Sequence, residues 1–493
     1  MITRRGILGG LLAGGVISAL SPALAEVMDR SPRPVPRGGK PVAAAPVAQT
    51  AETLVAAAKL TGTVAFVLAD AATGAVLESR EAAVPMPPAS VTKAVTTLYA
   101  LEHLGAGRRF LTRVLATGPM QGGVVQGDLV LAGGGDPTLQ TDQLGDLVAD
   151  LRKRGLKGVT GRFLYWEGAL PQVPRVAEDQ PDHVGYNPAI SGLNLNFNRV
   201  HFEWKKAGSD WSLSMDARGE RFVPRVGMVD MKVARRETPI FTYKKGEGHE
   251  DWTVASSALG KGGSRWLPVR LPGLYMAEVF RTLAAAQGIT LPAGQAVTSV
   301  PKGDELGRVE SNALPEVLRE MLRWSTNITA ECCGLASSGQ ARLAASGQAM
   351  TDWVRTTFGG QASFADHSGL GGASRVSATD LAQILVKAHA QGRGLKPLLR
   401  NVGMKDAKGK VIDGHPVQVV AKSGTLNFVS ALAGHITPPG GREMVFAILT
   451  GDPARRDAVP VADREDAPGA KAWTARSRTL QGQLISRWAS LYA

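Results

Sequence analysis

The sequence predicts an α/β protein of the α+β type, in which helices flank a five-stranded antiparallel sheet and a β-rich segment is inserted. Apolar, β-branched runs bounded by turn residues occur near both ends of the chain, and such runs are typical of strands. Much of the chain between them carries apolar residues at helical spacing. A third region, at about 109–270, consists of short strand-like runs separated by many glycines.

The five expected strands come from two distant parts of the chain. The two N-terminal runs flank a turn at 70–74, and the last two C-terminal runs flank the turn sequence Pro-Pro-Gly-Gly at 438–441. Strands joined by short turns pair in the antiparallel sense. The expected strands are residues 63–68, 75–78, 416–421, 428–436 and 444–450.

A C-terminal helix over 472–492 is expected to cover this sheet. Its apolar residues recur at helical spacing at Trp473, Leu480, Leu484, Trp488 and Leu491. Docking of this helix on a membrane is the alternative. Packing on the sheet is favoured because the sheet needs a second layer, and because only Arg476, Arg478 and Arg487 charge the opposite face of the helix.

Ser90 and Lys93 form an S-x-x-K pattern at the start of an expected helix. Pro87 and Pro88 interrupt regular structure before it, and residues 91–103 carry apolar side chains at helical spacing. Lys93 therefore lies one turn after Ser90 on the same helix face, within reach of its hydroxyl group. A serine here can also be only a helix N-cap, so this pattern alone leaves both readings open.

Two further patterns follow in a fixed order. One is S-x-N at Ser325 and Asn327, and the other is Lys422-Ser423-Gly424-Thr425 after the expected strand 416–421. Together with the first pattern they indicate an active-site serine whose general base is a lysine. Gly424 has no side chain, so a substrate is expected to run beside this strand as an added strand.

The protonation state of Lys93 decides whether it can act as a base. A lysine at its ordinary pKa of about 10.4 is a poor base at neutral pH. Burial and a neighbouring cation both lower a lysine pKa, and Lys422 is the expected neighbour. The sequence therefore predicts a cluster of Ser90, Lys93, Ser325 and Lys422, in which one lysine is neutral and the other is charged.

With these patterns in place, the chain resembles the D-alanyl-D-alanine carboxypeptidase/endopeptidase family, the class C low-molecular-mass penicillin-binding proteins. The resemblance covers nearly the whole chain after its N-terminal leader. It departs from the family at Thr326, where an acid is common, at Ser423, where threonine is common, and at His367, where glycine is usual. Further segments that resemble family motifs are 127–139, 190–196, 327–331, 366–370 and 374–378.

The resemblance implies a penicillin-binding/β-lactamase-like fold and a serine hydrolase that cleaves D-alanine bonds of peptidoglycan stem peptides. Ser90 would form the acyl-enzyme, Lys93 would take its proton, and the N–H groups of Ser90 and Thr425 would hold the oxyanion. Ser325 would relay a proton, and Asn327 would orient Lys93 and the substrate amide. The residues implied to receive the substrate carboxylate are Lys422, Ser423 and Thr425. β-Lactams would be covalent inhibitors, and no cofactor or metal is implied.

Spacing separates this family from its relatives. The gap between Ser90 and Ser325 is more than twice the gap between Ser325 and Lys422, and compact serine β-lactamases have no room for such an insertion. Two alternatives stay open. One is a peptidoglycan-binding protein with weak catalysis, and the other, less favoured, is a serine β-lactamase or esterase.

The N-terminus predicts export. Arg4 and Arg5 precede an apolar run that ends in small residues, which is the pattern of a signal peptide over 1–25 cleaved after Ala25. The arginine pair leaves the twin-arginine and general export routes both open. A proline-rich tether over 26–50 follows. The transpeptidase-like domain is then expected at 51–108 and 271–493, with inserted accessory domains at 109–270, in a periplasmic protein.

Composition adds little on partners. The 493-residue chain carries a formal net charge of +13, which favours anionic surfaces. Its basic residues are dispersed and accompany no nucleic-acid motif, so nucleic acid is not expected. Peripheral association with the wall or a membrane and a dimeric state are left open.

Adjacent Cys332 and Cys333 are expected to be small buried side chains without a disulfide. His367 is expected to be structural, with a cleft-lining role as the alternative.

Overall fold

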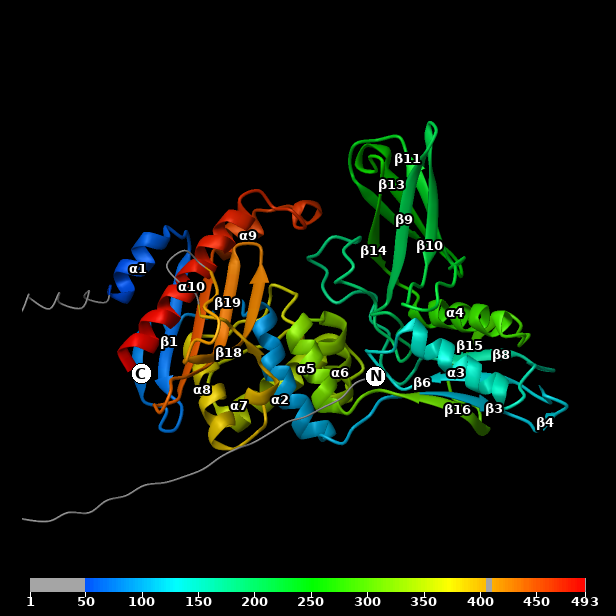
Figure 1. Ribbon diagram of the computed structural model, residues 1–493, viewed down its shortest axis with the longest axis horizontal. Helices are drawn as coiled ribbons and strands as arrows, with labels where there is room; N and C mark the ends of the chain where they lie inside the picture. Colours follow the sequence, from blue (N-terminus) through cyan, green and yellow to red (C-terminus); the bar gives the residue numbers. More distant parts are fainter. Residues whose placement is uncertain (1–48, 405–409, 493) are drawn as a thin grey trace, which may run out of the picture. The chain divides into compact units, whose positions relative to one another are not determined.

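The computed structural model describes residues 49–404 and 410–492, so the expected signal peptide and nearly all of the expected tether lie outside the described residues. The structure contains a six-stranded sheet in the order β17-β18-β19-β20-β1-β2, built from both ends of the chain (Figure 1). The five expected strands are confirmed, and a two-residue strand joins the edge beyond β18. The strands are β1 Thr63–Asp70, β2 Val76–Arg80, β17 Arg400–Asn401, β18 Gln418–Leu426, β19 Val429–Thr437 and β20 Met444–Gly451.

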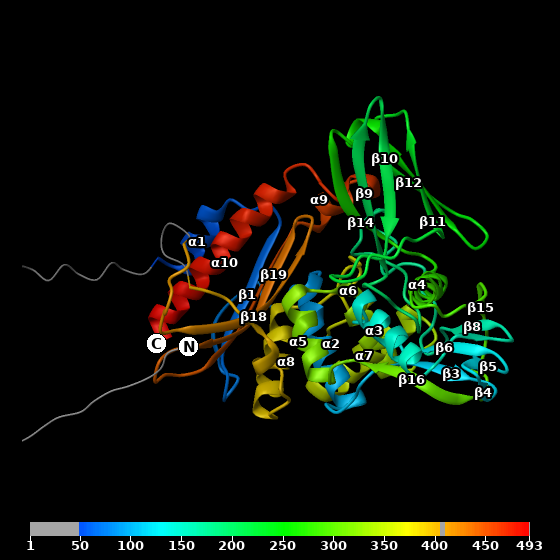
Figure 2. The ribbon, with the colours of Figure 1, turned by 45° about the vertical axis from the view of Figure 1, so that its right-hand side comes forward.

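Helices cover both faces of this sheet (Figures 1 and 2). Strand β1 explains why both layers are needed, because its side chains alternate between two cores. Phe66 packs in the core beneath α1 (Ala51–Ala58) and α10 (Ala470–Tyr492), whereas Val67 packs in the core beneath the helices on the opposite face. A strand that is buried on both faces has a continuous run of apolar residues in its sequence, rather than alternating apolar and polar residues.

The C-terminal helix packs on the sheet as expected. Trp473, Leu480, Leu484 and Trp488 are all completely buried, whereas Leu491 is 46 % exposed. The expectation for Leu491 was therefore wrong. It lies in the last turn of α10, where Tyr492 packs against the core instead.

The second helical layer carries the first two sequence patterns. Its central helix is α2 (Thr92–Leu104), which follows a single turn of 3₁₀ helix, η1 (Ala89–Val91). The helices around α2 are α5 Leu314–Trp324, α6 Asn327–Ser338, α7 Leu343–Phe358 and α8 Ala378–Ala390. Cys332 and Cys333 are buried, free thiols on α6, as expected for small core side chains.

The inserted region forms a second hydrophobic core. A five-stranded sheet in the order β15-β8-β6-β3-β16 lies against α3 and α4, and two three-stranded sheets, β10-β9-β14 and β11-β13-β12, extend the region. Its elements are β3 Leu111–Ala116, β6 Leu129–Gly133, α3 Thr141–Lys153, β8 Phe163–Trp166, β9 Arg199–Ala207, β10 Asp210–Asp216, β11 Val229–Ala234, β12 Phe241–Lys245, β13 Glu250–Ala255, β14 Gly262–Pro268, α4 Pro272–Ala286, β15 Gly294–Ala296 and β16 Asp304–Glu310. Minor elements are β4 Met120–Gln121, β5 Val124–Val125 and β7 Gly158–Val159.

This second core continues past the expected boundary at 270. Tyr275 and Phe280 of α4 are buried in it, and β16 pairs along its length with β3. Residues up to about 310 therefore pack with the insertion rather than with the six-stranded sheet.

Within 49–404 and 410–492, none of the helices combines the length and the apolar character that crossing a membrane requires.

Burial of α10 predicts a clear contrast between two leucines of the same helix. Leu480→Ala should lower the free energy of unfolding by about 2–5 kcal/mol, because it removes completely buried methyl groups and leaves a cavity. The matched change Leu491→Ala should alter it by no more than about 0.5 kcal/mol. Urea unfolding followed by fluorescence measures both, and equal losses would contradict this packing of α10.

Candidate active site

Ser90 lies in η1, just before the helix that carries Lys93. The N-terminal cap of α2 is Val91, and no side-chain cap bond is formed there, so Ser90 is not a helix cap. Ala89 adopts a left-handed conformation with φ +47°, which is costly for a residue with a Cβ and persists only where the surrounding structure enforces it. Lys93 lies one turn later, and its Nζ is 3.0 Å from Ser90 Oγ.

The amine of Lys93 is completely buried and contacts three oxygens. Besides Ser90 Oγ, it lies 2.8 Å from Asn327 Oδ1 and 2.7 Å from the carbonyl oxygen of Ser368. These last two oxygens can only accept hydrogen bonds. A neutral amine that donates both protons to them points its lone pair at the hydroxyl of Ser90.

The surroundings of Lys93 favour that neutral form. Burial holds the pKa of Lys93 well below its usual range, and the positive charge of Lys422 lowers it further. Glu331 and Asp366 act in the opposite direction on this pKa. Burial and a second cation were expected to lower the pKa of Lys93, and both do.

Two buried carboxylates shape the loop that caps Lys93. Glu331 accepts from the N–H groups of His367 and Ser368 at 3.0 and 2.8 Å. Asp366 accepts from the N–H groups of Gly369 and Gly371 at 2.6 and 2.8 Å. These bonds fix the carbonyl of Ser368 against the lysine. The sequence patterns included Glu331 and Asp366 in family-like segments but did not mark them as parts of the site.

His367 is a structural side chain, as expected. Its Nε2 lies 2.6 Å from Ser346 Oγ, and burial lowers its pKa to about 3. The ring fills the space beside Gly334, where a Cβ would lie 2.1 Å from the His367 ring. It is completely buried and does not line the cleft.

Ser325 and Lys422 form the second half of the site. Ser325 ends α5 in a left-handed conformation with φ 60°, and its Oγ lies 3.0 Å from Lys422 Nζ. Burial, together with the smaller effect of the charge of Arg400 on β17, lowers the pKa of Lys422 to about 8. No local pattern in the sequence marks Arg400, because Arg400 comes near Lys422 only through the pairing of β17 with β18.

Asn327 follows Ser325 by two residues in the chain and contacts Lys93 of the first half. Its Oδ1 accepts from Lys93 at 2.8 Å, and its Nδ2 donates to the carbonyl oxygen of Tyr186 at 2.9 Å. The structure thus brings Ser90, Lys93, Ser325, Asn327 and Lys422 together.

Gly424 meets a packing requirement that the sequence patterns did not show. A Cβ at this position would lie 2.6 Å from the Pro88 carbonyl oxygen and 2.8 Å from the Ser90 nitrogen. The glycine therefore lets β18 pass directly against the backbone that carries Ser90. Ser423 and Thr425 alternate with Lys422 and Gly424 along the strand, so their side chains lie on its other face, and both residues are exposed.

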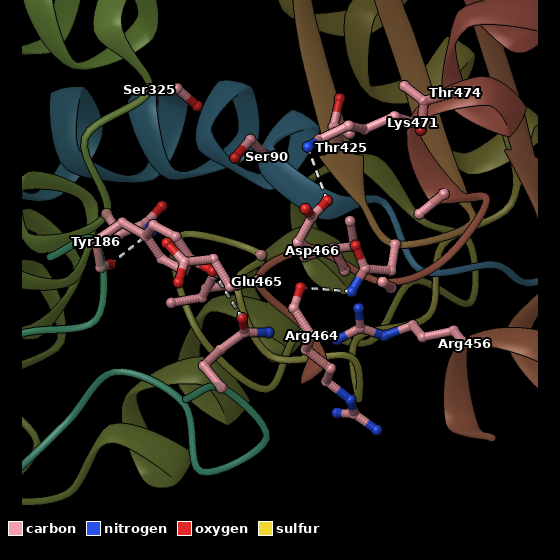
Figure 3. A pocket seen from close by; sticks show the side chains of 18 of the residues that line it. Ser90, Tyr186, Ser325, Thr425, Arg456, Arg464, Glu465, Asp466, Lys471 and Thr474 are labelled. Carbon is pink, nitrogen blue, oxygen red and sulfur yellow. Dashed lines mark hydrogen bonds and ion pairs between the residues drawn. The ribbon is translucent and has the colours of Figure 1, made fainter. Parts of the chain in front are cut away.

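The site opens into a cleft of about 500 Å³ that is lined by Ser90, Ser325, Asn327 and Thr425, among others (Figure 3). Further lining comes from a segment that the sequence patterns did not single out: Arg456 of α9 (Pro453–Asp457) and residues 464–467, which follow η4 (Val461–Asp463). Here Arg456 and Arg464 both bind Asp179, at 2.6 and 3.0 Å.

One cluster away from this cleft has metal-ligand chemistry. His389, His435 and Glu443 place ligand atoms within 4.8 Å of one another. The ammonium of Lys396 already lies 2.8 Å from Glu443 Oε2, and His435 Nδ1 lies 2.9 Å from Oε1. An ammonium therefore already balances the carboxylate charge, and we assign no metal to this cluster.

Comparison with known proteins places the chain in a family. Residues 47–467 match the model of the D-Ala-D-Ala carboxypeptidase 3 (S13) family. The D-alanyl-D-alanine carboxypeptidase of Actinomadura sp. (strain R39) is 28% identical over 427 residues, 78% of this chain and 76% of the relative. Carboxypeptidase Rv3627c of Mycobacterium tuberculosis is 28% identical over 489 residues, 90% of each chain.

Solved structures show a similar fold. The crystal structure of penicillin binding protein 4 (DacB) from Haemophilus influenzae superposes with a TM-score of 0.69 at 19% identity, over 88% of this chain and 99% of that one. Because the family model matches well over half of the sequence, the chain belongs to the D-Ala-D-Ala carboxypeptidase 3 (S13) family.

Proposed function

We propose that Ser90 is the nucleophile with which this serine peptidase cleaves D-alanine bonds of peptidoglycan stem peptides, as a carboxypeptidase and/or endopeptidase. The observation that carries this proposal is the setting of Lys93. Its buried amine contacts two oxygens that can only accept, and the third oxygen in reach is the hydroxyl of Ser90. A lysine in this setting is a general base aimed at one hydroxyl.

The proposed reaction has two steps. Lys93 takes the Ser90 proton while Oγ attacks the carbonyl carbon, and the N–H groups of Ser90 and Thr425 stabilise the oxyanion. The C–N bond then breaks, the proton passes through Ser325 to the leaving amine, and an ester on Ser90 remains. Water attacks this ester while Lys93 accepts a proton from the water. The bond between the acyl carbon and Ser90 Oγ then breaks, Lys93 returns the proton to Oγ, and the freed carboxylic acid leaves. Lys422 stays charged beside Ser325, and Asn327 orients Lys93 and the substrate amide.

The substrate carboxylate is proposed to bind at Ser423 and Thr425, on the exposed face of β18, near the charge of Lys422. A β-lactam would acylate Ser90 in the same way. Support comes from penicillin binding protein 4 of Haemophilus influenzae, which has been solved in complex with a β-lactam and shares this fold. Export to the periplasm is proposed from the sequence alone, because residues 1–25 lie outside the described part of the chain.

For the domain organisation, we propose that the insertion runs from about 109 to about 310 rather than ending at 270. The support is the packing of α4 and β16 with the second core. The net positive charge of the chain supports attraction to anionic wall polymers.

Replacing the nucleophile should abolish acylation. Ser90→Ala is expected to show no covalent labelling by a fluorescent penicillin, because no other hydroxyl faces the Lys93 amine in the described structure. Ser209→Ala, in the exposed β9–β10 turn, should label as the unaltered chain does. Labelling of Ser90→Ala would overturn the assignment of the nucleophile, and an unlabelled native chain would favour a binding protein without turnover.

Replacing the base should slow acylation without preventing it. Lys93→Met removes the amine and keeps an apolar side chain in the buried site, and the acylation rate should fall by about 10²–10⁴-fold. Stopped-flow or quenched labelling measures this rate. A fall of less than threefold would contradict the role of Lys93 as general base.

The pH profile of kcat/KM should be bell-shaped. Lys93 works only when neutral, so activity rises as pH increases through its lowered pKa. Lys422 is charged below its pKa of about 8, so activity falls as pH increases beyond that value. In Lys422→Arg the alkaline limb should move upward, because an arginine keeps its charge. An alkaline limb that stays near pH 8 in this variant would show that Lys422 does not cause it.

A further inference from the structure

Four cations line the cleft, and one of them is not neutralised. Arg456 and Arg464 bind Asp179, and Lys471 binds Asp466 at 2.7 Å, the pair drawn with a dashed line in Figure 3. The fourth is Arg478 of α10. In residues 49–404 and 410–492, no carboxylate forms an ion pair with its guanidinium.

The position of Arg478 is fixed by its neighbours on α10. Ser477 Oγ lies 2.7 Å from Thr450 Oγ1 on β20, and Gln481 Nε2 donates to Ser430 Oγ on β19 at 3.1 Å. Ser477 and Gln481 are both buried. These contacts hold the helix against the sheet on either side of Arg478 and set the direction in which its side chain leaves the helix.

That direction leads to β18. Arg478 Nη2 donates to Thr425 Oγ1 at 3.2 Å, and Ser423 lies on the same face of the strand. A second hollow beside the main cleft is lined by Ser423, among others. Ser325, Thr425 and Arg478 line both the cleft and this hollow.

The bond to Thr425 also orients the hydroxyl. A threonine oxygen that accepts from a guanidinium keeps its own hydrogen free to donate elsewhere. Two hydroxyls on one face of β18 and an unneutralised guanidinium beside them form a set of donors with a net positive charge. Such a set suits a carboxylate, because arginine donors match the geometry and the charge of that group.

We propose that Arg478 is a specificity-determining residue that binds the carboxylate on the leaving-group side of the scissile bond, together with Ser423 and Thr425. This inference rests on the proposed function, because it assumes that the acyl carbon is attacked by Ser90. The charged side chain of Arg478 comes from α10, outside the three sequence patterns. Through this side chain the enzyme would select substrates whose leaving group carries a free α-carboxylate.

The test uses two ester substrates that differ only in this carboxylate. One is an acyl-D-alanyl-D-lactate with a free carboxylate, and the other is its C-terminal carboxamide. The unaltered chain should prefer the acid. In Arg478→Gln, kcat/KM for the acid should fall by about 10- to 100-fold, as expected for the loss of a charged hydrogen bond, mainly through KM. The value for the carboxamide should change by less than threefold.

Two further variants separate charge from geometry. Arg478→Lys keeps the charge but loses the planar fork, so it should restore part of the preference for the acid. Arg476→Gln removes an exposed charge two residues away on the same helix and should behave as the unaltered chain for both substrates.

The outcomes distinguish this inference from the proposed function. Equal losses for acid and carboxamide in Arg478→Gln, or no loss for either, would overturn the carboxylate role while leaving Ser90 as nucleophile. Failure of the unaltered chain to hydrolyse either ester, with no acyl-enzyme detected by mass spectrometry, would overturn the proposed function itself.

Discussion

The site depends on the burial of one lysine amine. An ammonium group that loses its solvation is strongly disfavoured, so a buried lysine tends to be neutral. Lys93 lies between α6 and the loop after Asp366, and the geometry of its three contacts requires both to be in place. Glu331 holds that loop through two N–H groups. The helical layer is therefore organised around a fixed, buried amine whose pKa is lowered, and Ser90 is the hydroxyl that this amine faces.

The second constraint is close backbone approach around Ser90. Strand β18 passes the Ser90 segment at Gly424, where a Cβ would meet the Pro88 carbonyl and the Ser90 nitrogen. From another part of the chain, Gly369 has φ +73°, and its Cβ would lie 1.9 Å from the carbonyl oxygen of Ala89. Both glycines allow segments that are distant in sequence to enclose the serine. The contact at Gly424 also brings Lys422 and the proposed oxyanion-binding N–H group of Thr425 to the site, because all three residues lie on β18.

Much of the fold and the centre of the site follow from local patterns. The five strands, the covering C-terminal helix and the pairing of Ser90 with Lys93 all rest on short-range periodicity, which the chain displays directly. Glu331, Arg400 and the binding of Asp179 by Arg456 and Arg464 were missed, because each joins positions far apart in the chain with no repeating pattern. The packing of Gly424 against Ser90 was also missed, because these neighbours are known only once β18 is placed against Ser90.

The sequence by itself determined five strands of the main sheet, the helix that carries Lys93 and the C-terminal helix, because helix and strand periods are local properties. It also determined that Lys93 lies within reach of Ser90, since three positions span one helical turn. Only the tertiary structure decided that Lys93 is completely buried and that its pKa is lowered, because desolvation depends on every segment packed around it. The same holds for the arginines of α10. Arg476, Arg478 and Arg487 look alike in the sequence, yet the packing of Ser477 and Gln481 on the sheet places Arg478 beside Thr425.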